Sequence, residues 1–304
     1  MTSATDTIEY GHDAAPRHAS RHGAMADSEP ESDQAHDQTA SADQLSTPTS
    51  RRWGGWSAIW PRALAIGLSV AVWWMLTAVV WADNPVLGRI GPADALPALW
   101  SGLVDGSLIG DLRTSLIRLG TGLGAAFVIG VPLGALLGAH RRLEQATAPV
   151  TNFIRMISPL AWAPVVIVAV GVGSAPVILL IAITAVWPLM LGTAAGVRAV
   201  SPAWHAVATS LGANDVERLR LITVPAIRAN VLTSLRLALG VAWIVLVPAE
   251  MLGVDSGLGY AVLNARDQLD YAGLGATVVL IGITGFTLDS AFRLIFRVDP
   301  RVTT

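Results

Sequence analysis

Long apolar stretches separated by short polar ones dominate the sequence after residue 50. A helix needs about 20 apolar residues to cross a bilayer. Stretches of this kind cover residues 63–81, 119–139, 231–252 and 271–288. Another, from Met156 to Val197, has no charge over 42 positions, which is too long for one span. The turn sequence GVGSAP at 171–176 divides it, so the pattern predicts an all-α polytopic membrane protein with six transmembrane helices.

The ends of the chain differ from this pattern. Residues 1–50 are rich in Ser, Ala, Asp, His and Thr, contain nine of the 22 acidic residues and have no apolar run. Because such a segment cannot build a core, we predict a disordered tail over 1–50. We expect the first transmembrane helix and an outer loop over 51–109, a core over 110–293 and a short C-terminal tail over 294–304.

The arginines are distributed unevenly about the predicted spans. Thirteen, Arg155 among them, fall on the side that carries both termini, and four fall on the other side. Because basic residues collect in cytoplasmic loops, both tails, the 140–155 loop and the polar segment 201–225 are predicted to be cytoplasmic.

Two residue types are absent, and both absences exclude functions. The chain has no Cys, so it has no disulfide and no thiolate ligand or nucleophile. All 20 basic residues are Arg, so it lacks the Lys that a P-loop requires, and any ATP would be bound by another subunit. No Ser/His/Asp arrangement, paired carboxylate or metal-ligand spacing stands out. We therefore expect no catalytic site, metal or cofactor, and no nucleic-acid partner.

The polar segment reads AVATSLGANDVERLRLITVPA over 206–226. Ser201 is a plausible N-cap with Pro202 at the first helical position, which predicts a helix over 201–216, with Gly212 as its C-cap or a sharp turn. A second helix over 214–223 is expected to end before the proline at 225. An apolar stripe at helical spacing is formed by Trp204, Val207, Ala208 and Leu211. This face fits either a cytoplasmic partner or the lipid headgroups.

The spacing of this segment resembles the EAA-x3-G-x9-I-x-LP motif of the membrane subunits of bacterial ABC importers. The matching positions are Ala206, Val207, Ala208, Gly212, Ile222 and Pro225. The chain departs from the motif where Ala206 replaces Glu, Val207 replaces Ala and Val224 replaces Leu. The resemblance implies that the segment is a coupling helix that docks into an ATPase subunit.

Further stretches resemble the permeases for aliphatic sulfonates, taurine and nitrate, namely LGVAWIVLVPAEMLG (239–253), SGLGYAVLNARDQ (256–268) and GDLRTSLIRLGTGLGAAFVIGVPLGALLG (110–138). The resemblance implies a type I importer permease in a bacterial inner membrane, which is not itself an enzyme. It also implies a second permease subunit, in a homodimer or heterodimer, as well as ATPase subunits and an extracytoplasmic binding protein. The alternative is a stand-alone secondary transporter or a membrane enzyme, although no internal repeat or acidic cluster favours either.

Glu250 lies near the outer end of the fifth predicted span. An ionisable residue within a span is a functional candidate, so Glu250 is expected to be part of an outer gate or a structural anchor. The loop that follows offers Tyr260, Asn264 and Arg266 as polar groups. In the resembling family this region borders the outer gate, and a plain connecting loop is the alternative.

Overall fold

The computed structural model describes residues 59–84 and 86–295, and every regular element in those ranges is a helix. The predicted tail over 1–50 and residues 296–304 lie outside the described residues. The chain divides into two units, residues 1–60 and 61–304, and the described elements belong to the second apart from the first two residues of α2.

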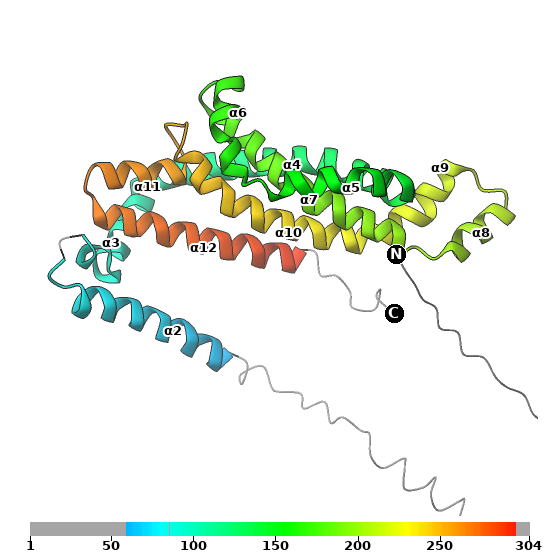
Figure 1. Ribbon diagram of the computed structural model, residues 1–304. Helices are drawn as coiled ribbons and strands as arrows, with labels where there is room; N and C mark the ends of the chain where they lie inside the picture. The colour runs from blue at the N-terminus through cyan, green and yellow to red at the C-terminus, as the bar shows by residue number, and fades with distance from the viewer. Residues whose placement is uncertain (1–58, 85, 296–304) are drawn as a thin grey trace, which may run out of the picture. The chain divides into compact units, whose positions relative to one another are not determined.

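The elements are labelled as in Figure 1. In chain order they are α2 (Ile59–Met75), η1 (Leu76–Val80), η2 (Gly88–Ile90), α3 (Pro92–Val104), α4 (Ser107–Ala139), α5 (Arg141–Met156), η3 (Pro159–Trp162), α6 (Ala163–Val170), α7 (Ser174–Ala199), α8 (Pro202–Ser210), α9 (Asp215–Arg218), η4 (Leu219–Thr223), α10 (Val224–Glu250), α11 (Leu258–Asp267) and α12 (Tyr271–Ile295).

The centre of the bundle is formed by α4, α7 and α10, which run alongside one another (Figure 1). Glycines let α4 approach α7 closely, because a Cβ at Gly138 would lie 2.7 Å from the carbonyl oxygen of Ala194. Gly130 and Gly134 lie against α7 in the same way. Small residues at every fourth position allow such close packing between membrane helices. Here they serve packing within one chain.

Four helices are long and apolar enough to cross a membrane, namely α4, α7, the continuous helix 215–250 and α12. The helices 141–156 and 159–170 form a fifth span if the bent pair is counted as one span. Residues 64–80 form a shorter apolar helix. Apart from helix 141–156, these elements coincide with the apolar stretches of the sequence, while the number six and the side of the termini stay predictions.

The third predicted span was expected to begin at Met156, after a cytoplasmic loop over 140–155, but residues 141–156 form the helix α5 instead. The two helices 141–156 and 159–170 meet at an angle of 83°. Pro159 and Pro164 lie at and just after the break, where their missing N–H groups are compatible with new helix starts. Arg155 was placed among the arginines at the cytoplasmic ends of spans. It lies instead next to this bend, at the far end of α5.

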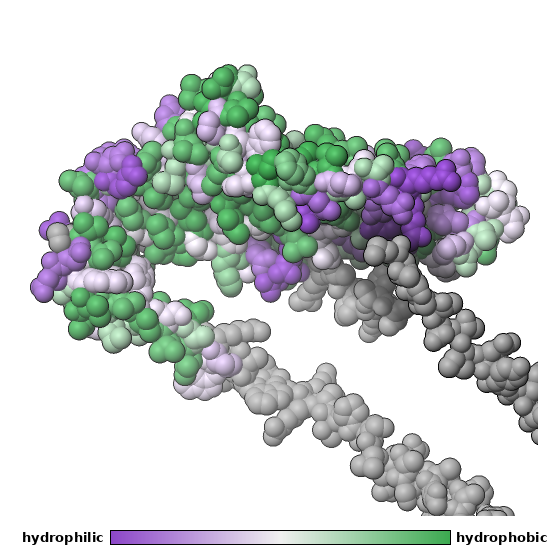
Figure 2. Space-filling view, viewed as in Figure 1, coloured by the Kyte–Doolittle hydropathy of each residue, from purple (hydrophilic) through white to green (hydrophobic). Residues whose placement is uncertain are grey.

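Apolar side chains cover most of the outer surface of the long helices (Figure 2). Val168 and Met156, for example, are 88% and 84% exposed. Such a surface is expected where lipid rather than water is the solvent. Hydrophilic residues gather at both ends of the bundle, one of which carries α8 and α9 and is called the α8 end. The opposite end carries α11 and is called the α11 end (Figure 1).

Candidate functional site

At the α8 end, a short helix and a tight turn follow the last turn of α7. The side chain of Ser201 accepts a hydrogen bond from the N–H of Ala203, and Pro202 occupies the first turn, as the sequence predicts. The helix stops at Ser210 because Gly212 turns the chain with φ +79°, a left-handed conformation that a β-carbon disfavours. The predicted turn at Gly212 is therefore confirmed, while the first helix ends at Ser210 and not at residue 216.

The next helix begins with a capping box. Asn214 accepts from the N–H of Glu217, and the Glu217 carboxylate accepts from the N–H of Asn214. The expectation that this helix ends before Pro225 is wrong. In the π-helical turn η4, the N–H of Val224 donates to the carbonyl of Leu219, five residues earlier. Pro225 then lies in the first turn of α10, where a missing N–H is tolerated, so the helix continues through it.

The apolar stripe of α8 is only partly available to a partner. Trp204, Val207 and Leu211 are 64%, 52% and 80% exposed, respectively. Ala208 is buried within the chain, and its carbonyl accepts from the N–H of Ala213. Ala208 is therefore not part of the exposed face of α8, and its role in docking stays a prediction. Ala206 and Gly212 are exposed beside the stripe.

The other motif positions lie beyond the turn. Ile222 is half-buried in η4, and Pro225 is exposed in the first turn of α10. Both residues lie at the α8 end. The structure therefore brings all the predicted coupling residues to one end of the bundle. A cavity of about 440 Å³ separates part of α8 from the ends of α4 and α7, with His205, Arg218 and Gly138 in its lining.

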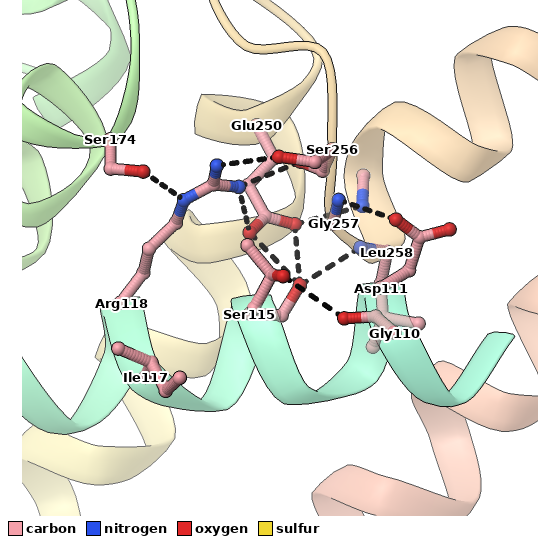
Figure 3. A network of polar contacts seen from close by, with 12 residues as sticks. Gly110, Asp111, Ser115, Ile117, Arg118, Ser174, Glu250, Ser256, Gly257 and Leu258 are labelled. Atoms are coloured by element: carbon pink, nitrogen blue, oxygen red, sulfur yellow. Dashed lines mark hydrogen bonds and ion pairs between the residues drawn. The ribbon is translucent and has the colours of Figure 1, made fainter. Parts of the chain in front are cut away.

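At the α11 end, Glu250 is fully buried and takes part in a polar network (Figure 3). Arg118, on α4, donates from Nη1 to the Glu250 carboxylate at 2.9 Å. The hydroxyl of Ser115, one turn earlier on α4, donates to the same carboxylate. A buried charge is tolerated only when paired and hydrogen-bonded, and both conditions hold here.

The guanidinium of Arg118 is also bonded to the loop after α10. It donates to the carbonyl and hydroxyl of Ser256 at 2.7 and 3.0 Å, and its Nε donates to the hydroxyl of Ser174, at the start of α7. One side chain of α4 therefore links α7, α10 and the 251–257 loop (Figure 3).

The start of α11 completes the network. Its first three N–H groups donate to side chains of other elements. The N–H of Gly257 donates to the carboxylate of Asp111, and the N–H of Leu258 donates to the hydroxyl of Ser115. The N–H of Gly259 donates to the carboxylate of Glu250. The first N–H groups of a helix have no partner within it and favour negative charge. Two carboxylates and a hydroxyl from other elements thus cap α11.

Gly257 and Gly259 make this arrangement possible. Gly257 has φ +104°, and a Cβ there would lie 2.5 Å from a Glu250 carboxylate oxygen. A Cβ at Gly259 would lie 2.7 Å from Cβ of Glu250. The two glycines therefore allow the backbone of α11 to approach the buried carboxylate.

The other predicted outer residues do not join Glu250. Tyr260 and Asn264 line a polar cavity of about 350 Å³ formed by α3, α4, α11 and α12. Arg266 is exposed and pairs with its neighbour Asp267. The structure thus separates the buried Glu250 network from the exposed face of α11.

Comparison with known proteins gives the family. The sequence profile described as binding-protein-dependent transport system inner membrane component matches residues 130–304, more than half of the chain. The chain belongs to this family. It is therefore a membrane component of an ABC transporter, and the sequence resemblance is confirmed.

Three permease relatives are similar over most of the chain. A bicarbonate transport system permease of Synechococcus elongatus is 35% identical, covering 64% of this chain and 70% of the relative. A nitrate import permease of Synechocystis sp. is 30% identical, covering 75% and 84%. The taurine transport system permease of Escherichia coli is 30% identical, covering 78% and 90%.

The fold of this permease has a solved counterpart. A chain of the inward-facing methionine ABC transporter MetNI aligns with a TM-score of 0.53 at 19% identity, covering 65% of this chain and 96% of that chain. At that identity the likeness concerns the fold alone, which is that of a type I importer permease.

Sequence reasoning missed most of the polar network in this permease. Arg118 is one of the four arginines that the sequence analysis assigns to the side opposite the termini, without any further role, and Ser115 and Asp111 were not singled out. One signal was available, because Glu250 and Arg118 both lie near the outer ends of predicted spans. A buried carboxylate within a membrane requires a cationic partner, so Arg118 could have been paired with it.

Proposed function

We propose that this permease imports a small anion and is driven by a separate ATPase subunit that docks on α8. Bicarbonate, nitrate or a sulfonate such as taurine are the candidate cargoes, because the relatives are named for these molecules. An extracytoplasmic binding protein delivers the cargo, and a second permease subunit, identical or different, completes the transmembrane pathway.

The observation that carries the coupling proposal is the exposed stripe of α8. Trp204, Val207 and Leu211 are large apolar side chains on a short element among the hydrophilic residues of the α8 end. Burying each such side chain stabilises a complex by roughly 1.5–3 kcal/mol. A partner that covers α8 can then transmit its own closure to α7 and α10, between which α8 is inserted.

Gly212 provides the test of this proposal. Its φ of +79° disfavours Val, whereas Asn tolerates the left-handed region and serves as a matched control. No atom lies within 4 Å of a Cβ at this position, so the Cβ that both substitutions add meets no neighbour. We expect Gly212→Val to abolish ATP-driven uptake in proteoliposomes, and Gly212→Asn to retain it, with both variants inserted normally. Normal uptake by Gly212→Val would refute a coupling role for the turn.

Docking itself is tested by crosslinking, since the chain has no native Cys. Single substitutions His205→Cys and Thr209→Cys should form crosslinks with Cys residues introduced in the ATPase, and these should change with nucleotide. Labelling only by lipid-phase probes, with or without the ATPase, would favour the alternative in which α8 rests on the headgroups.

A further inference from the structure

Arg155 lies on the exposed surface of the bundle, in the last turn of α5 and beside the break between α5 and α6. Helix α5 begins at Arg141, at the α8 end, where the ion pair of Glu144 with Arg198 ties it to the end of α7 (Figure 1). Fourteen residues at 1.5 Å each place Arg155 about 21 Å further along. A hydrocarbon core is about 30 Å thick, so this arginine lies well inside the apolar region if helices 141–156 and 159–170 form one bent span.

Arg155 differs in its contacts from two other arginines that lie within helices. Arg118 pairs with Glu250, and Arg236 pairs with Asp289 at 2.7 Å. Within the described part of the chain, Arg155 has neither an ion pair nor a hydrogen bond. Arg155 is also exposed, and so are the nearby apolar side chains of Phe153 and Met156. An exposed, unpaired guanidinium is too costly to face hydrocarbon, which indicates that this surface faces water or another polar group.

A cavity lies directly beside it. The cavity has a volume of about 330 Å³, and its lining includes Arg155, Trp162, Thr184, Trp187, Pro188 and Val241. Arg155 is the one charged residue in the lining. The indole N–H groups of Trp162 and Trp187 have no acceptor among the described residues, so they add two free donors. The lining therefore offers positive charge and N–H donors, without a carboxylate to repel an anion.

We propose that Arg155 binds the transported anion transiently at this cavity, midway through the membrane. A planar guanidinium matches the oxygen atoms of a nitrate, bicarbonate or sulfonate group in a bidentate geometry. The volume admits such an ion with part of its hydration shell. The break between α5 and α6 gives the ion a polar position within a span, as discontinuous helices do in other transporters. This inference rests on the proposed function, the import of a small anion.

The test uses the complete transporter, with its ATPase and binding protein, in proteoliposomes. Charge-assisted hydrogen bonds contribute enough that losing the guanidinium should raise KM for the anion about tenfold or more. Arg155→Cys should show this loss. Treating the purified variant with a cationic aminoethyl thiol reagent should restore uptake, and an anionic sulfonatoethyl reagent of similar size should not. Arg142→Cys, at the exposed start of α5, is the matched control and should transport like wild type.

The outcomes separate the two proposals. Wild-type KM in Arg155→Cys, or equal rescue by both reagents, overturns the role of Arg155 and leaves anion import standing. If Arg155→Cys fails to assemble, Arg155→Lys keeps the charge and should keep uptake within a few-fold of wild type, whereas Arg155→Gln should not. Equal uptake by the Lys and Gln variants also overturns the inference. A wild-type transporter that imports none of nitrate, bicarbonate or taurine overturns the proposed function and this inference with it.

Discussion

The two ends of the bundle differ in whether their side chains find partners within the chain. At the α11 end, Glu250 is fully buried and every charged or polar partner comes from the same chain. At the α8 end, Trp204, Val207 and Leu211 are large apolar side chains that the chain leaves uncovered. The first end is complete in one subunit, whereas the second presents a surface that another molecule can cover.

This difference separates stability from assembly. A buried network of charges is destabilised strongly when one member is removed, because the remaining charge stays buried without its partner. An exposed apolar residue has little effect on the stability of the subunit that carries it. Substitutions at the α11 end should therefore act on the fold, and those at the α8 end on what the fold binds.

The largest effect is expected for Glu250→Ala. Arg118 would remain buried without a carboxylate, and we expect the free energy of unfolding to fall by about 3–5 kcal/mol. Unfolding of the purified permease in mixed micelles, followed by circular dichroism, measures the change. The exposed pair of Asp215 and Arg218 at the α8 end is the matched control, since Asp215→Ala should cost about 1 kcal/mol or less. Equal losses in the two variants would contradict the comparison.

A smaller loss is expected for Gly257→Ala. The new Cβ would require both a left-handed backbone and displacement of the Glu250 carboxylate, which together cost about 2 kcal/mol or more. Gly240→Ala is the control, because that glycine lies in α10 with no atom within 4 Å of a Cβ. There, Ala should stabilise the helix by about 0.5–1 kcal/mol. The same unfolding measurement applies, and a neutral Gly257→Ala would mean that α11 is not held as the structure shows.

Much of the fold follows from the sequence, because membrane spans depend on local composition. The apolar stretches, the turn at 171–176 and the N-cap at Ser201 all rest on short-range patterns, and all are present in the structure. Helix α5 and its bend to the next helix were missed, since the polar residues of 140–155 were interpreted as a loop and hydropathy does not record a helix of that composition. The continuation of the helix through Pro225 was missed because a π-helical turn has no comparable sequence signal.

The two candidate sites also differ in how far the sequence predicts them. The turn at Gly212 could be predicted from a motif confined to some twenty residues. The partners of Glu250 could not, because Arg118 and Ser115 lie more than 130 residues away in sequence. The burial of Ala208 likewise depends on tertiary packing that the sequence of α8 does not record. Pairings of this kind become visible only when α4, α10 and α11 are placed together.

The smallest effect on stability is expected for Leu211→Ala, which tests the other half of the comparison. Leu211 is 80% exposed, so truncating it should change the free energy of unfolding by about 0.5 kcal/mol or less. Its loss should nevertheless weaken ATPase binding by about 1.5–3 kcal/mol if the partner buries it, since that is the value of one large apolar side chain. Titrating the ATPase against the permease in nanodiscs measures the difference.

Phe286→Ala is the control, because Phe286 is 73% exposed on α12, away from α8, and its truncation should leave ATPase affinity unchanged. If both variants weaken binding equally, the loss reflects general disturbance of the bundle. If neither does, the exposed stripe of α8 is not the surface that meets the ATPase.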